Sequence, residues 1–296
     1  MKLRLMMLVC GLMFLASAGP PGKVVRAGQK ISWTMGEGRK LYRYGDLTAI
    51  FDRVQCAPLG DDCEEGDVNP MLTIVRTDGA KVELEGSPMQ NILMLGPLTR
   101  GGPAAAFFQS YTGGMHCCEQ MRVVTPGPDG LKVVDLGSYD GMDIGWPRDV
   151  DGDGTLDFVV TDDNFLYAFE SYAASYAPPR VLNVVGDKAV DVTGEPRFRA
   201  VFAKPMAETR KVCASGKFPN GACAAYAAMA ARTGQFDAAW PIVLSHYNKL
   251  TGVWPEGCKV ARDADANCPE GKEIAYPDYP AALRAFLVEN GYIPAA

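Results

Sequence analysis

Short apolar runs alternate with turn residues over the first two thirds of the chain. Each run is rich in β-branched and aromatic side chains, and clusters of Gly, Pro and Asp separate one run from the next. This pattern predicts strands, and the Pro-Gly-Pro-Asp-Gly segment at 126–130 predicts a hairpin turn between two of them. The predicted strands are Ala49–Arg53, Leu72–Arg76, Ala104–Tyr111, Met121–Thr125, Lys132–Leu136, Phe158–Thr161 and Phe165–Phe169.

The hydrophobic period changes beyond Ala203, where helical spacing replaces alternation. Three helices are predicted, at Ala222–Thr233, Phe236–Tyr247 and Tyr279–Glu289. The join at Gly234 resembles the turn between the two helices of a tetratricopeptide repeat. Because a solenoid needs about three stacked repeats, a disulfide-stapled helical hairpin with inward aromatics is the favoured interpretation.

These patterns together predict a mainly β fold with a C-terminal, disulfide-stapled α-helical domain. The predicted boundaries place a signal peptide at 1–18, an all-β domain at 19–203 and the helical domain at 204–296. The aromatic-rich stretch from Phe165 to Tyr172 is expected to fill the β core.

The N-terminus carries the features of a secretory signal. Lys2 and Arg4 precede an apolar run from Leu5 to Leu15, and Ala16-Ser17-Ala18 supplies a small-residue cleavage site. The run is shorter than the roughly 20 residues that a membrane helix needs. We therefore expect a periplasmic or secreted protein that begins at Gly19 and has no membrane span in its mature chain.

The charge of the mature chain argues against nucleic acid as a partner. The full chain has a formal net charge of −6, and loss of Lys2 and Arg4 with the signal makes the mature chain more negative still.

Cysteine usage indicates disulfides. Cys10 lies inside the signal, which leaves an even number in the mature chain, as an oxidising compartment favours. Loop-closure entropy favours near neighbours, so Cys56–Cys63, Cys213–Cys223 and Cys258–Cys268 are the expected pairs. Cys117 and Cys118 either bridge each other or take Cys56 and Cys63 as partners.

The segment Asp149–Asp157, Asp-Val-Asp-Gly-Asp-Gly-Thr-Leu-Asp, predicts a calcium site. Acids occupy loop positions 1, 3, 5 and 9, and Gly154 occupies position 6, which permits a sharp reversal. Calcium takes six to eight oxygen ligands, and alternate side chains in such a loop converge on one point. The expected ligands are the side chains of Asp149, Asp151, Asp153 and Asp157 and the backbone carbonyl of Thr155.

The surroundings of this loop distinguish it from an EF-hand. Position 12 is Val160 rather than Glu, and Phe158–Thr161 is a predicted strand rather than a helix. An acidic loop that leads directly into an apolar strand resembles the calcium loops of FG-GAP and VCBS repeats. That resemblance covers about 20 residues, from Trp146 to Leu166, and implies a sheet domain that could close as a propeller.

A second cluster, Gly113-Gly114-Met115-His116-Cys117-Cys118, has two interpretations. Imidazole and thiolate together could bind zinc or form a nucleophile pair. Zinc normally needs four ligands and the chain has one other histidine, His246, so a structural disulfide at a tight turn is favoured.

Catalytic motifs find little support. The segment 137–141, Gly-Ser-Tyr-Asp-Gly, lacks the central Ser of a hydrolase elbow. Asp140 and Asp143 could act as an acid and base pair, but acids beside a calcium loop more often extend its negative surface. We expect a non-catalytic protein that binds a protein or polysaccharide or serves the cell envelope; the alternative is an exported hydrolase with a cleft between its two domains.

Overall fold

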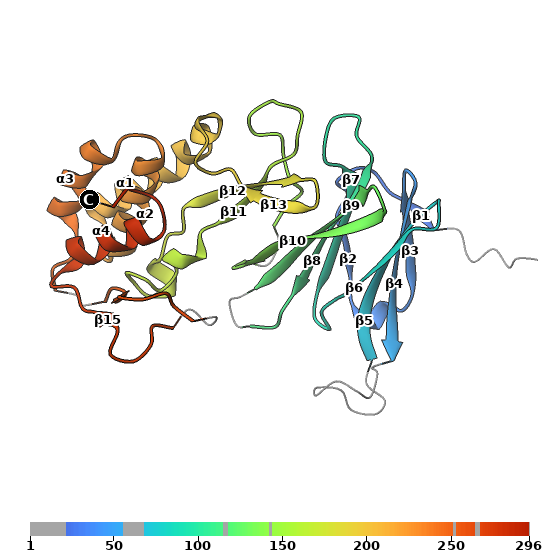
Figure 1. The fold of residues 1–296 in the computed structure, drawn as a ribbon, viewed down its shortest axis with the longest axis horizontal. Helices are drawn as coiled ribbons and strands as arrows, with labels where there is room; N and C mark the ends of the chain where they lie inside the picture. Colours follow the sequence, from blue (N-terminus) through green and yellow to red (C-terminus); the bar gives the residue numbers. More distant parts are fainter. Residues whose placement is uncertain are drawn as a thin grey trace, which may run out of the picture.

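The computed structural model describes residues 22–55, 68–114, 118–141, 144–250, 253–263 and 267–295. Most strands lie toward one end of the elongated molecule, and the α-helices lie at the other (Figure 1). The mainly β fold with a C-terminal helical region is thus confirmed. None of the helices in these ranges combines the length and apolar character that crossing a membrane requires.

Two five-stranded sheets pack face to face at the N-terminal end. Alternate residues Leu47, Ala49 and Phe51 of one strand are buried, as a sheet with one solvated face requires. Phe51 stacks on Trp33 of the opposite sheet at 5.0 Å between ring centroids. The first sheet has the order β1 (Lys23–Val24), β3 (Lys40–Tyr44), β4 (Leu47–Gln55), β5 (Val68–Arg76), β6 (Lys81–Glu85). The second has the order β10 (Gly130–Tyr139), β9 (Glu119–Gly127), β8 (Ala104–Tyr111), β7 (Asn91–Pro97), β2 (Ile31–Trp33).

A third, three-stranded sheet covers the other face of the second sheet. It has the order β11 (Phe158–Thr161), β12 (Pro179–Val185) and β13 (Lys188–Asp191), with both ladders antiparallel. β8 is buried throughout, because Phe108 faces the first sheet while Phe107 meets Phe158 of the third. In the part of the chain that the structure describes, the sheets stack as layers and do not close as a propeller.

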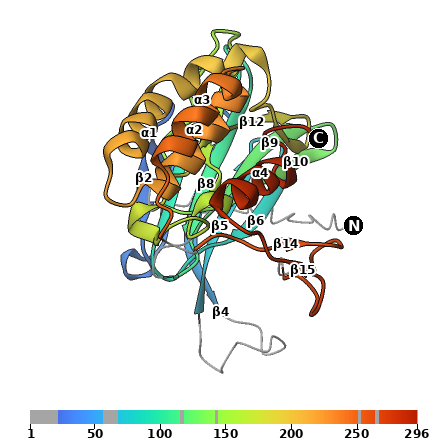
Figure 2. The same ribbon diagram turned by 90° about the vertical axis from the view of Figure 1, so that its left-hand side faces the viewer.

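The helical region packs around one central helix. α2 (Pro219–Arg232) is buried almost along its whole length, since its many alanines let neighbouring elements approach closely. Figure 2 looks onto this end of the molecule, with α2 between α1 and α4. The other helices are α1 (Ala203–Ser215), α3 (Phe236–His246) and α4 (Tyr279–Glu289), and a small ladder joins β14 (Gly257–Cys258) to β15 (Glu273–Ile274). Short 3-10 helices are η1 (Met35–Glu37), η2 (Asp163–Phe165), η3 (Tyr172–Ala174) and η4 (Pro196–Phe202).

Two disulfides hold this region in the expected pairing. Cys213 bonds to Cys223 and joins α1 to α2, and Cys258 bonds to Cys268 across the segment that follows α3. Cys118 is also disulfide-bonded. Cys56, Cys63, Cys117 and His116 lie outside the described residues, as do Asp143 and the signal segment 1–18.

The strand predicted at Phe165–Phe169 is wrong. The chain turns there instead: the N–H groups of Phe165 and Ala168 donate to carbonyls three residues back. Tyr167 has φ 59°, a left-handed conformation that a strand excludes. Phe165 and Phe169 are buried against α4 rather than in a β core. Alternating aromatics fit this double turn as well as they fit a strand.

Candidate functional site

The acidic loop 149–157 is closed at its base and fixed to a neighbouring turn. Arg148 and Asp157 exchange backbone hydrogen bonds of 3.1 and 2.8 Å, which closes the loop immediately before β11. The loop also docks on the β7–β8 turn: the Arg100 N–H donates to the Gly154 carbonyl, and the Leu156 N–H donates to the Leu98 carbonyl, each at 2.8 Å. The hydrogen bonds to Arg148 and to the β7–β8 turn therefore give the loop a defined shape.

Three carboxylates of the loop converge. One oxygen each of Asp149, Asp151 and Asp153 lies within 4.8 Å of the other two. Each of the three also accepts hydrogen bonds from the loop's own backbone. The Asp149 carboxylate accepts from the N–H groups of Gly152 (2.7 Å) and Gly154 (3.0 Å), and both glycines have positive φ, which lets the chain reverse around it.

The two middle acids repeat one local motif. Asp151 Oδ1 accepts from the N–H of Asp153 at 3.0 Å, and Asp153 Oδ1 accepts from the N–H of Thr155 at 2.7 Å. The Thr155 N–H lowers the pKa of Asp153 below its ordinary value. These bonds leave Oδ2 of both acids directed away from the loop backbone. Carboxylate oxygens arranged in this way are the ligands that calcium prefers.

Arg197, at the start of η4, binds these outer oxygens. Its Nη1 lies 2.8 Å from Asp151 Oδ2 and 2.7 Å from Asp153 Oδ2, while its Nε donates to Glu195 at 2.7 Å. Next to it in sequence, Phe198 is buried in a small apolar cluster that Val150 of the loop contacts. The loop is therefore attached to η4 by charge and by packing.

Asp157 has a different environment from the other acids. It is 1% exposed, and its two oxygens accept from the Val150 N–H at 2.8 Å and the Asn183 amide at 2.6 Å. Burial raises its pKa, and the negative charges of Asp151 and Asp153 raise it further. Asp157 is not one of the three converging acids. In this geometry Asp157 stabilises the loop through its hydrogen bond with the Val150 N–H. Ligation of a metal by Asp157 and by the Thr155 carbonyl stays a prediction.

Arg197 and Asn183 were not predicted from the sequence. Asn183 carried a usable signal, because it is a polar residue inside the apolar strand Val181–Val185 and has to find a buried partner. Arg197 carried none, since its sequence surroundings are those of an ordinary exposed arginine.

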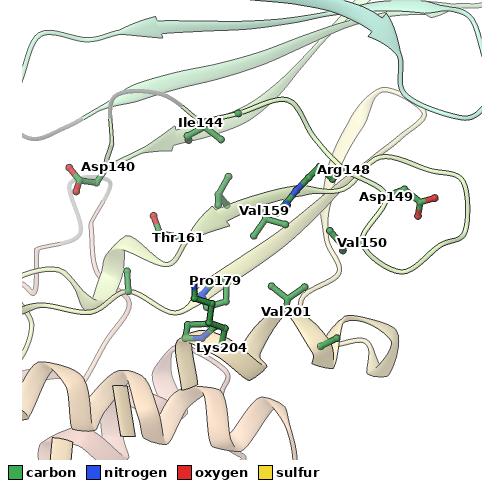
Figure 3. A pocket seen from close by; sticks show the side chains of 15 residues that line it. Asp140, Ile144, Arg148, Asp149, Val150, Val159, Thr161, Pro179, Val201 and Lys204 are labelled. Carbon is green, nitrogen blue, oxygen red and sulfur yellow. The ribbon is translucent and has the colours of Figure 1, made fainter. Parts of the chain in front are cut away.

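An open groove lies next to the loop, between β11 and the start of α1 (Figure 3). Its volume is about 800 Å³. Val150, Val159 and Val201 line it together with the charged residues Arg148 and Lys204. Asp140 lies at the other end, where its Oδ2 accepts a hydrogen bond of 2.5 Å from the Tyr172 hydroxyl.

The sequence of this chain is similar to those of known proteins. Residues 200–291 match the family described as the sll0997 C-terminal domain. The probable thylakoid lumen protein sll0997 of Synechocystis sp. is 35% identical over 236 residues, which make up 76% of this chain and 68% of that protein. The chain belongs to the sll0997 family.

A further relative of this sll0997-family chain is more distant. The uncharacterized protein y4bJ of Sinorhizobium fredii is 30% identical over 191 residues, which cover 63% of this chain and 30% of that protein. No solved structure matches the chain. The family match at 200–291 includes the four described α-helices and begins after the acidic loop, which lies at 149–157.

Proposed function

We propose that this sll0997-family protein is exported and binds one calcium ion in the loop 149–157. The metal braces a non-catalytic β region that binds a protein or polysaccharide at the cell envelope. The observation that carries the proposal is the convergence of Asp149, Asp151 and Asp153 within 4.8 Å. The loop leads directly from Asp157 into β11, which supports the likeness to FG-GAP and VCBS calcium loops.

The charge balance of the site supports a divalent cation. Among the described residues, the converging carboxylates form ion pairs through Asp151 and Asp153 with one arginine, Arg197, which is also engaged by Glu195. Calcium bound to the outer oxygens of Asp151 and Asp153 takes the place of Arg197 Nη1. It also brings two charges where Arg197 brings one, and it binds carboxylates without a directional requirement.

Export rests on three features. The N-terminal sequence has the layout of a secretory signal, disulfides close the helical region, and the Synechocystis relative is described as a thylakoid lumen protein. Each of these is expected of a protein that folds in an oxidising compartment.

A hydrolase that uses the groove is the second candidate, because Asp140 lies in the groove beside Asp163. Burial raises the pKa of Asp163, as a proton donor would need. However, the two Asp163 oxygens accept from the Asp140 N–H at 2.6 Å and the Thr161 hydroxyl at 2.7 Å. Both oxygens serve structure, so binding is favoured over catalysis.

Calorimetric titration with calcium chloride and melts with and without EDTA test the calcium site. A ligand that binds only the native state adds about 2.7 kcal/mol at a hundredfold excess over Kd, so EDTA lowers Tm. Asp151→Asn combined with Asp153→Asn removes both the titration heat and the EDTA effect. Asp187→Asn, in the exposed β12–β13 turn, retains them. Absence of heat and an unchanged melt in the wild-type protein overturn the proposal.

A further inference from the structure

β11 is an edge strand with one open side. It pairs with β12 through all four of its residues. On its other side, within the described ranges, the sole backbone pairing is the bridge between Arg148 and Asp157, one residue before the strand begins. An unpaired strand edge offers N–H and C=O groups to an added strand.

The hydrogen-bond directions show which residues face the open side. Both backbone groups of Asp157 point toward Arg148, away from β12, while the Asp162 N–H donates to Pro178 at the β12 side. Backbone groups alternate sides along a strand. Phe158 and Val160 therefore bond to β12, and the N–H and C=O groups of Val159 and Thr161 point to the open side.

These residues line the large groove. Val159 and Thr161 both border its volume of about 800 Å³, and Figure 3 shows Val159 on β11 with Val150 and Val201 around the same space. Four residues of an added strand, at about 3.3 Å per residue, match the length of β11. The groove thus combines free backbone partners with apolar walls.

Charged residues at the two ends of β11 favour one direction for an added strand. Arg148 lies at the beginning of the strand, is exposed and makes no ion pair among the described residues. Asp140 lies at the end of the strand, where its N–H bonds to Asp163 and its buried Oδ1 has no hydrogen-bond partner among the described residues. A strand added antiparallel to β11 begins near Asp140 and ends near Arg148. A basic or amino group at its start and a carboxylate at its end then meet opposite charges.

We propose that this groove binds an extended peptide segment of a partner protein, added antiparallel to β11. Main-chain bonds form to Val159 and Thr161, apolar side chains contact Val159 and Val201, and a carboxylate at the C-terminal end pairs with Arg148. This inference rests on the binding role in the proposed function and names its partner class; it does not depend on the calcium ion.

The probe is a library of fluorescent hexapeptides with free termini that alternate valine with varied residues, measured by anisotropy against the full mature protein in calcium and in EDTA. For peptides that bind, the affinity is expected to fall at least tenfold when Val159 is replaced (Val159→Pro). That substitution removes an N–H on the open side, where proline is tolerated in edge strands. Arg148→Gln lowers the affinity for peptides with a free C-terminal carboxylate and leaves the affinity for the corresponding C-terminal amides unchanged.

Two controls separate the outcomes. N-methylation of peptide residues on the pairing side abolishes binding, and methylation of the other residues does not. Amide exchange of the free protein shows Val159 and Thr161 exchanging faster than Phe158 and Val160, and slowing when peptide binds. A library without binders, or binders indifferent to Val159→Pro, overturns the inference. Peptide binding in EDTA by a protein that gives no calcium titration heat and no EDTA effect on its melt rejects the calcium proposal alone.

Discussion

Arg197 Nη1 lies 2.8 Å from Oδ2 of Asp151, whose side chain is 3% exposed although it belongs to a surface loop. The arginine covers the carboxylate and supplies a positive charge from a segment 46 residues farther along the chain. The same oxygen is one that the proposed calcium ion requires. Arginine and metal are therefore competitors for this loop, and their competition can be measured.

Arg197→Gln is expected to tighten calcium binding. The substitution removes a cation that calcium has to displace, and ion pairs at partly exposed positions contribute up to about 1 kcal/mol, equivalent to about fivefold in Kd. Calorimetry measures the change. Arg199→Gln, an exposed arginine in the same 3-10 helix, should leave the affinity unaltered. Weaker binding by the Arg197 variant would show that the arginine assists the metal instead of opposing it.

Two acids of one loop should titrate on opposite sides of their ordinary pKa of 3.8. In the metal-free protein the pKa of Asp153 is lowered by the Thr155 N–H, and that of Asp157 is raised by burial. Asp153 thus adds stability above its unfolded pKa that is lost as pH falls through its folded pKa. Asp157 has the opposite sign: its protonation at falling pH favours the folded state. Carboxyl NMR titration follows both groups, and an inverted order of the two would contradict the geometry.

Asn183→Leu is expected to lower the free energy of unfolding by about 1–3 kcal/mol, because it leaves a buried oxygen of Asp157 without a donor. Asn183→Asp adds a second carboxylate at the same point and costs more at pH 7. Part of that loss returns at pH 5, as one of the two carboxylates takes up a proton. Urea unfolding at both pH values measures this, and a pH-independent loss would refute carboxylate repulsion as its cause.

The two described disulfides form a matched pair, since each spans 10 residues. Loop-closure entropy predicts a loss of about 3 kcal/mol on replacing either pair with alanines. Their reduction should differ, because Cys213 and Cys223 are buried, whereas Cys258 and Cys268 are partly exposed. Timed alkylation in mild reductant with mass spectrometry should therefore detect Cys258 and Cys268 first. Simultaneous release would mean that the helical region opens as a unit.

Elements with a strong local pattern could be predicted from the sequence. The predicted ranges of β8, β11 and α4 coincide with the observed ones, because apolar runs and the capping Asp278 are local signals. α1 was not predicted, since only Thr209 and Cys213 are buried in it and no apolar stripe marks it. A helix held mainly by one disulfide and by its neighbours leaves little trace in hydrophobic periodicity.

The candidate site divides in the same way. The convergence of Asp149, Asp151 and Asp153 follows from bonds between residues two to five apart, which the spacing of acids and glycines encodes. The parts contributed by Arg197 and Asn183 depend on how β12 and η4 pack against the loop. No local pattern specifies that packing, so the sequence predicted the acidic loop but not the arginine that pairs with it.

The acidic loop is attached to the rest of the fold by partners far apart in the chain, from the bridge between Thr99 and Thr155 to the ion pairs of Arg197. Contacts of such sequence separation are slow to form, because long loops have to close first. A site completed late is absent from the transition state of folding. Ligands of such sites retard unfolding and leave the folding rate nearly unchanged. Calcium at this loop would govern how long the native state persists rather than how fast it is reached.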